Sequence, residues 1–160
     1  MADYIYPAPG VANVELTLKV HHTSKSADAP GLLIPSLQDV TVNAANDVFT
    51  WTQLDAAAKK QIATTSTNSL GMNLVVNQGS FFGTGTNPTT TAAGAGVIGL
   101  STQKALVEFD LYMGDESDGT AGKILNGTGY ITGLAPTVSA DSPVWVSPIT
   151  ITLDSDYTIT

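Results

Sequence analysis

The sequence predicts a mainly β fold, an antiparallel β-sandwich or barrel with one short flanking helix and long loops. Two observations lead to this class. Apolar and polar residues alternate in several short segments separated by Gly, Pro, Asn and Asp, which is typical of half-buried strands joined by turns. Only one stretch spaces its apolar residues as an amphipathic helix does.

The composition indicates a single domain over residues 1–160 with an unusually weakly charged surface. Charged residues make up 12% of the chain, and the net charge is −8 with no Arg. Because Arg is the side chain that best matches phosphates and base edges, this composition argues against tight binding of nucleic acid or nucleotides. The lack of Cys excludes disulfides and thiolate metal sites.

The N-terminal half is predicted to contain an extended arm followed by strands. Residues 1–12 carry Tyr, Ile and Pro, and we interpret them as an extended arm suited to docking on a neighbouring subunit. They lack the features of a signal peptide, and no apolar run is long enough to cross a bilayer, so we expect a soluble protein made in the cytoplasm. Residues 14–20 alternate without error and predict a strand. A polar loop over 23–35 precedes two short predicted strands at 37–43 and 48–52.

Residues 52–63 are predicted to form the single helix. Thr52 followed by Asp55 resembles a capping box, and Lys59 lies four residues after Asp55, where an opposite charge supports a helix. The apolar residues of this segment form a narrow stripe made of Leu54, Ala58 and Ile62.

The middle of the chain is predicted to contain two strands on either side of a long loop. Residues 69–77 alternate and predict a strand. Residues 79–103 are rich in Gly, Thr and Ala and are predicted as a long loop, either mobile or ordered by contact with another molecule. Residues 105–114 form the clearest predicted strand, followed by an acidic turn at 115–119. Its core face is expected to carry Ala105, Val107, Phe109, Leu111 and Met113.

The C-terminal part is predicted to add four short strand segments. They lie at 123–125, 129–134, 144–147 and 149–153. Pro148 separates the last two, and it predicts an edge strand or a bulge because Pro has no N–H to donate to a neighbouring strand.

No motif in the sequence indicates an enzyme. His21 and His22 are adjacent, so they would point to opposite sides of a strand, and we interpret them as a surface pair. The sequence contains neither a Gly-x-Ser-x-Gly nucleophile motif nor a Gly-x-x-x-x-Gly-Lys-[Ser/Thr] phosphate loop. Gly94 and Gly96 only loosely resemble a dinucleotide-binding loop, since the strand and the third Gly that it requires are missing.

The acidic residues are interpreted as polar surface. Residues 115–119 lack the full spacing and closing Glu of a calcium loop, which favours a solvated acidic hairpin over a cation site. Glu108 and Asp110 share a strand face about 7 Å apart, at roughly 3.3 Å per residue. Paired carboxylates can act as acid and base, but the polar face of a sheet is the better explanation. We therefore assign no catalytic, metal-binding or cofactor-binding residue and expect no cofactor.

Several segments occur in an order known from one protein family. They are Val-Glu-Phe-Asp-Leu-Tyr-Met-Gly at 107–114, Gly-Thr-Gly-Tyr-Ile-Thr-Gly-Leu at 127–134, and Asp-Ser-Pro-Val-Trp-Val-Ser-Pro-Ile-Thr-Ile-Thr-Leu at 141–153. Together they resemble the C-terminal half of major tail proteins (tail tube proteins) of long-tailed bacteriophages. Phe-Thr-Trp-Thr-Gln-Leu-Asp at 49–55 and the helix after it look like that family's small helix between β-hairpins. The resemblance extends over residues 38–155, and nothing in it matches the loop at 79–103.

The resemblance implies a structural virion protein without enzymatic activity. Its subunits would form hexameric rings that stack into the tail tube, a conduit for DNA delivery. The implied partners are other copies of the chain and the other tail proteins, namely the tape measure, the baseplate or tip, the terminator and, in some tails, the sheath. Double-stranded DNA would pass through the bore without specific binding, since like charges repel. The implied location is the virion tail, after synthesis in the host cytoplasm and without membrane insertion.

Two other classes of protein remain as alternatives. One is another self-assembling surface protein, such as a capsid-decorating or pilus-type subunit, although a pilin normally brings a signal peptide and often a disulfide. The other is a carbohydrate-binding β-sandwich, which would group exposed aromatic residues on one face. Trp51 and Trp145 lie within predicted strands, and we expect them to pack in the core or in an interface.

Overall fold

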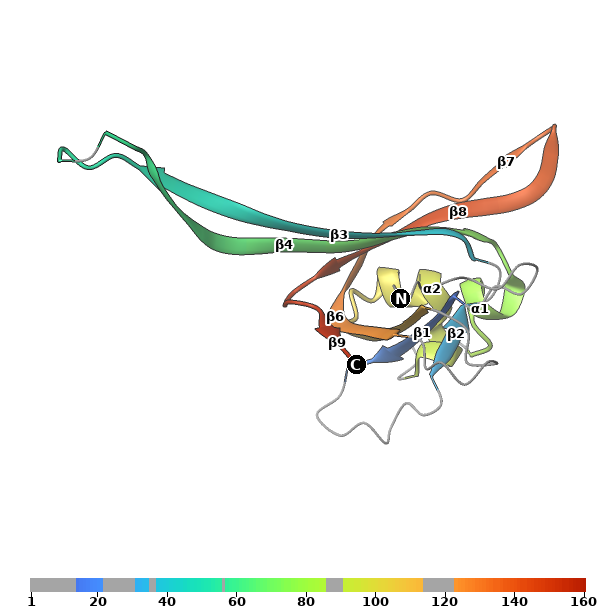
Figure 1. Ribbon diagram of the computed structural model, residues 1–160. Helices are drawn as coiled ribbons and strands as arrows, with labels where there is room; N and C mark the ends of the chain where they lie inside the picture. The colour runs from blue at the N-terminus through green and yellow to red at the C-terminus, as the bar shows by residue number, and fades with distance from the viewer. Residues whose placement is uncertain (1–13, 22–30, 35–36, 56, 86–90, 114–122) are drawn as a thin grey trace, which may run out of the picture.

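The computed structural model shows one curved antiparallel sheet with two short helices (Figure 1). It describes residues 14–21, 31–34, 37–55, 57–85, 91–113 and 123–160. The strands are β1 (Val14–Val20), β2 (Leu32–Ile34), β3 (Leu37–Trp51), β4 (Lys60–Val75), β5 (Val107–Met113), β6 (Lys123–Leu134), β7 (Thr137–Ser139), β8 (Ser142–Leu153) and β9 (Thr158–Ile159). The helices are α1 (Gln78–Phe82) and α2 (Ala92–Thr102). The predicted mainly β class is confirmed.

The sheet wraps around a single hydrophobic core. Its strand order is β2-β1-β5-β6-β8-β4-β3, with β7 paired to β8 and β9 paired to β6. In Figure 1, β3, β4 and β8 lie on one side of the helices, and β1, β2 and β6 lie on the other. One cluster of buried side chains joins both halves of the sheet to α1 and α2. Its fully buried members include Leu16, Leu18, Leu70, Phe81, Leu100, Phe109, Leu111, Ile149 and Ile151.

The strands predicted at 14–20 and 105–114 are confirmed as β1 and β5, which pair with each other. Leu16 lies opposite Leu111 and Leu18 opposite Phe109, and none of the four is accessible to solvent. Burying one such side chain contributes about 1.5–3 kcal/mol. The period-two pattern was informative here because one face of each strand packs on the core.

The prediction of a helix at 52–63 is wrong. Residues 60–63 begin β4, which runs antiparallel to β3, and the preceding residues form the turn between these strands. Ile62 lies opposite Phe49, and Leu54 is fully exposed in the turn. The predicted apolar stripe therefore has no core to face, and cross-strand pairing determines the local structure instead of helix propensity.

The two short strands predicted at 37–43 and 48–52 form one strand, β3. The pairing of β3 with β4 shifts where Asp47 alone stands opposite both Thr64 and Thr65, which is a β-bulge. The strand predicted at 69–77 is likewise only the inner part of β4, which begins at Lys60.

The prediction of a loop over 79–103 is wrong for the residues in α1 and α2. Asn77 caps α1 by accepting from the amides of Gly79 and Ser80, and Thr91 caps α2 by accepting from the amide of Gly94. Seven residues of α2 are buried, and most of the helix is Ala, Gly or another apolar residue. A helix that is apolar all round has no amphipathic stripe, so its sequence gave no helical signal.

The other predicted segments are joined or extended in the structure. Residues 32–34, predicted as loop, form β2 against β1. Residues 123–134 form one strand, and 142–153 form another that continues through Pro148. On one side of β8, Pro148 lies opposite Asn73 of β4. On the other side, β8 pairs with β6 from Ile149 onward and with β7 up to Val146, so Pro148 lies between these two pairings. The missing N–H is tolerated because this position lies between two partner strands.

Gly96, where α2 is kinked, packs against Gly83, which follows the end of α1. Gly96 has a φ of 66° and Gly83 a φ of 79°, a region that disfavours other residues. A Cβ on Gly96 would lie 2.3 Å from the backbone nitrogen of Gly83, which leaves no space for a side chain.

We expect Gly96→Ala to destabilise the fold by about 3 kcal/mol, the sum of left-handed strain and overpacking. Thermal unfolding should show the midpoint lowered by roughly 6–12 °C for a chain of this size. Gly71→Ala is the matched control, because nothing lies within 4 Å of the Cβ that it adds. Equal midpoints for the two variants would contradict the close approach of the helices.

Candidate functional site

The outer part of the β3–β4 hairpin projects away from the core (Figure 1). We call residues 44–51 and 60–67, with the turn that joins them, the β3–β4 arm. The described side chains of the arm are exposed except that of Trp51, which is half-buried. Pairing between β4 and β8 ends at Ser69 opposite Thr152, so the arm beyond this point is a two-stranded ribbon. An isolated ribbon of this kind is marginally stable in water.

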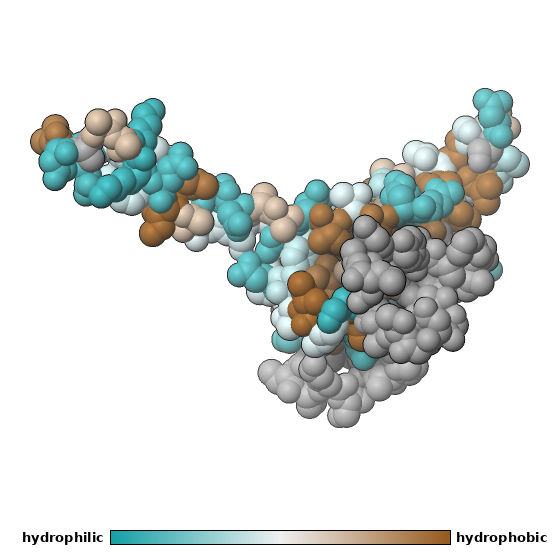
Figure 2. Space-filling model, viewed as in Figure 1, coloured by the Kyte–Doolittle hydropathy of each residue, from teal (hydrophilic) through white to brown (hydrophobic). Residues whose placement is uncertain are grey.

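The β3–β4 arm carries large apolar side chains outside the core. Phe49 is 59% exposed and lies opposite Ile62, which is 55% exposed. Phe49 also stacks on Trp51 with ring centroids 5.9 Å apart, and Leu54 is exposed in the turn. Phe49, Trp51 and Ile62 therefore share one face of the ribbon, and we call them the arm patch. Brown surface on this arm is visible in Figure 2. Exposed apolar residues gathered in this way are a common feature of interaction surfaces.

A second projection, the β7–β8 arm, comprises residues 137–146 and extends in another direction from the core (Figure 1). Its exposed apolar residues are Val138, Val144 and Trp145, of which Trp145 is 52% exposed. Neither Trp51 nor Trp145 belongs to the hydrophobic core, so the core alternative predicted for them is wrong. The interface alternative stays a prediction.

The two strands at the ends of the sheet order, β3 and β2, have a neighbour on one side only among the described strands. Exposed edges of this kind offer backbone N–H and C=O groups to another chain. The edge of β3 extends over residues 37–51 and continues into the β3–β4 arm. It therefore exposes both hydrogen-bonding groups and apolar side chains.

The outward face of β6, β8, β4 and β3 is polar but almost uncharged. Cross-strand partners on this face include Ser69 opposite Thr152 and Gly71 opposite Thr150. Asp39 contributes a charge, and its carboxylate accepts from the side-chain amide of Asn73 at 2.9 and 3.1 Å. We call this surface the hydroxyl face.

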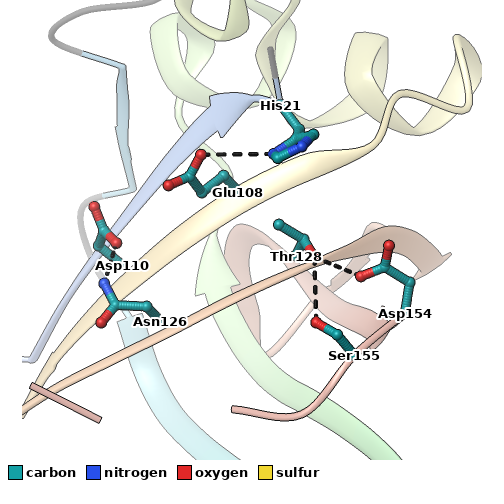
Figure 3. A network of polar contacts seen from close by, with 7 residues as sticks. All are labelled: His21, Glu108, Asp110, Asn126, Thr128, Asp154 and Ser155. Atoms are coloured by element: carbon teal, nitrogen blue, oxygen red, sulfur yellow. Dashed lines mark hydrogen bonds and ion pairs between the residues drawn. The ribbon is translucent and has the colours of Figure 1, made fainter. Parts of the chain in front are cut away.

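Glu108 and Asp110, the acidic pair considered in the sequence, lie on the opposite half of the sheet and are engaged in contacts (Figure 3). Glu108 lies 3.7 Å from the ring of His21, and Asp110 accepts a hydrogen bond from Asn126. Both carboxylates line an open hollow of about 520 Å³, together with Lys19 and residues of the C-terminal segment. The described residues contain no group of three His, Cys, Asp or Glu side chains arranged to hold a metal ion. The interpretation of Glu108 and Asp110 as a polar sheet face is consistent with this arrangement.

The remaining residues considered in the sequence do not come together as a site. Gly94 and Gly96 are buried in α2, where Gly96 contacts the end of α1. His22, the acidic turn at 115–119 and the arm at 1–12 lie outside the described residues. Neither α1 nor α2, the helices of the described residues, has the length and apolar character of a membrane span.

The backbone arrangement is shared with several solved assemblies. A chain in the tail of an empty GTA particle with C6 symmetry superposes with a TM-score of 0.60 at 13% identity, covering 91% of this chain and 95% of that one. A chain of the SPP1 tail tube gives 0.65 at 9% identity, covering 91% and 76%. The sheath/tube terminator of the extracellular contractile injection system PVC gives 0.59 at 15% identity, covering 97% of each chain. The chain has the tail-tube fold.

The sequence resemblance to tail tube proteins is thus confirmed at the level of the fold. The likeness covers 91–97% of this chain in these three comparisons. No protein-family profile and no curated protein matches the sequence. The chain therefore shares this fold at sequence identities of only 9–15%.

Proposed function

We propose that the chain is a structural protein that assembles into stacked hexameric rings forming the tail tube of a phage-like particle. The observation that carries this proposal is the β3–β4 arm, which exposes Phe49 and Ile62 beyond the core of a chain with the tail-tube fold. A ribbon with this much exposed apolar surface is stabilised when another molecule covers it. Because the solved relatives come from tails and tubes, the favoured partner is another copy of the chain.

The shape of the chain supports a head-to-tail mode of assembly. The β3–β4 and β7–β8 arms project in different directions, and each exposes apolar residues (Figure 1, Figure 2). Contacts between two different surfaces generate rings where the rotation closes and extended polymers where it does not. Other tail proteins, such as a terminator, would bind the same surfaces at the end of the tube.

A tube of these subunits suits the passage of DNA. Six copies of a chain with net charge −8 carry a charge of −48, and the chain contains no Arg to grip phosphates. We assign the hydroxyl face to the bore, because its Thr, Ser and Asn side chains present almost no formal charge to bind DNA. DNA would then slide along a polar wall while the acidic residues elsewhere on the ring oppose adsorption.

Negative-stain electron microscopy of the purified chain, together with its mass in solution, tests the proposal. We expect rings or tubes with a central hole and sixfold symmetry in averaged end views. Monomers or compact trimers at the highest soluble concentration would contradict the tube and favour the alternative of a capsid-decorating subunit.

A further inference from the structure

After β8, the chain leaves the sheet, forms a short excursion and returns to the same neighbouring strand. The amide of Asp154 donates to the carbonyl of Thr128 at 3.1 Å, and the Thr128 hydroxyl donates to the Asp154 carboxylate (Figure 3). The chain then rejoins β6 as β9, with Thr158 opposite Asn126. Thr160 and Ile124 exchange two backbone hydrogen bonds of 2.9 Å. Residues 154–157, which we call the C-terminal strap, are therefore held at both ends by β6.

The middle of the C-terminal strap reaches the root of the β3–β4 arm. The hydroxyl of Tyr157 lies 2.9 Å from the carbonyl oxygen of Asn43 and 2.6 Å from that of Ser69, and it donates its proton to this pair. Asn43 and Ser69 lie opposite each other in β3 and β4. Ser69 is also the last β4 residue paired with β8, through Thr152. Tyr157 thus binds both strands at the position where three strands become two.

Neighbouring contacts fix the C-terminal strap against both the arm and the core. The Asp156 carboxylate accepts from the hydroxyl of Ser66 and from the side-chain amide of Asn68, the latter at 3.0 Å. Asn68 is only 6% exposed, so this acceptor satisfies a buried donor at the base of the arm. The ring of Tyr157 packs edge-on against Phe109 with centroids 6.4 Å apart. Burial raises the pKa of the Tyr157 phenol above its ordinary value, so the group stays protonated and donates at neutral pH.

We propose that the C-terminal strap sets the direction of the β3–β4 arm, with Tyr157 as the positioning residue. Two-stranded ribbons twist more strongly than wider sheets, and β8 no longer pairs with β4 beyond Ser69. Phe49 lies six residues beyond Asn43 in β3, about 20 Å at ~3.3 Å per residue, so a tilt of about 10° at the root moves Phe49 by about 3.5 Å. A shift of that size would misplace Phe49 on a neighbouring copy. This last consequence rests on the proposed tube, whereas control of the arm's direction does not.

Pulsed electron spin resonance on the monomer tests the positioning role. The chain has no Cys, so Thr50→Cys on the arm and Gln103→Cys at the end of α2, both exposed, define a single pair of spin labels. Tyr157→Phe keeps the ring and its packing on Phe109 but removes the hydroxyl. We expect it to broaden the distance distribution between the labels. Tyr112→Phe, which removes a hydroxyl from β5, should leave the distribution unchanged.

Amide hydrogen exchange gives a second readout that a general loss of stability would not reproduce. In Tyr157→Phe, amides at 43–46 and 66–69 should exchange about three- to tenfold faster, as expected for losing one hydrogen bond in a local opening. Amides of β1 and β5 should keep their rates, because the core is intact.

The outcomes separate the positioning role from the proposed tube. Unchanged label distances and unchanged arm exchange in Tyr157→Phe would overturn the positioning role, even if the natural chain forms tubes. Faster exchange spread evenly over β1, β5 and the arm would also overturn it, since that indicates a merely structural contact. A loosened arm in Tyr157→Phe, together with a natural chain that forms no tubes, would leave the positioning role standing and reject the tube. Tubes from the natural chain, with few or none from Tyr157→Phe, would support both.

Discussion

Phe49→Ser is expected to leave the chain folded and to abolish tube formation. Phe49 is 59% exposed and lies outside the core, so its removal should change the free energy of unfolding of the monomer by less than about 1 kcal/mol. In an assembled tube the phenyl ring of Phe49 would be covered by a neighbouring copy, where a buried aromatic anchor typically contributes at least about 2 kcal/mol per contact. Each contact recurs in every subunit, so losing it should raise the protein concentration needed for assembly far above that at which the natural chain assembles.

Circular dichroism and electron microscopy of the same sample test this expectation. Thr50→Ser is the matched control, because Thr50 is the next residue of β3 and its side chain points to the opposite face of the ribbon from Phe49. We expect Thr50→Ser to assemble normally. Tubes of normal length from Phe49→Ser would show that the arm patch is not part of a subunit contact.

Phe109→Ala is expected to lower the free energy of unfolding by about 3–5 kcal/mol, as for other buried Phe residues truncated in a core. Phe109 is inaccessible to solvent in β5, opposite Gly127 of β6. A Cβ on Gly127 would lie 2.8 Å from the Phe109 ring, which shows that the ring fills the space above this glycine. Removing the ring leaves a cavity that the backbone of Gly127 cannot fill. The same change also removes the surface on which Tyr157 packs.

Denaturant unfolding with the midpoint and slope fitted together measures this loss. Phe82→Ala provides the control for the same change of side chain, since Phe82 is 52% exposed at the end of α1. We expect it to cost about 1 kcal/mol or less, mainly through its edge contact with Phe81. Similar losses for Phe109→Ala and Phe82→Ala would mean that β5 does not form the centre of the core.

The sequence predicted the strands that are long enough to show alternation over a core face, but it missed the three-residue strand β2. In β1 and β5, alternation placed Leu16, Leu18, Phe109 and Leu111 inside, and all four are fully buried. The order of such segments was also sufficient to indicate the tail-tube resemblance that the backbone comparison confirms as a fold. Hydrophobic periodicity is reliable in these strands because burial on one side constrains every second residue.

The arm, α2 and the contacts of Tyr157 were harder to predict, each for a different reason. The residues of the arm do not face a core. In the arm, Ile62 fell on a helical stripe with Leu54 and Ala58, although in the structure it pairs with Phe49 across a ribbon. In α2, buried Ala and Gly residues gave no periodic contrast. Tyr157 contacts a carbonyl 114 residues away, and no local pattern indicates a contact that distant.

The bulge opposite Asp47 has a consequence for the fidelity of a polymer. A ribbon exposed on both faces has no core to determine its strand register, and a slip of one residue turns every side chain to the other face. Here the Thr64 hydroxyl donates to the Asp47 carbonyl at 3.2 Å, and the Thr65 hydroxyl donates to its carboxylate at 3.0 Å. These bonds select one register, so every copy presents the arm patch on the same side. In the proposed polymer, a subunit with a slipped register would turn its arm patch away from the neighbouring copy, so a fixed register would let every subunit add in the same way.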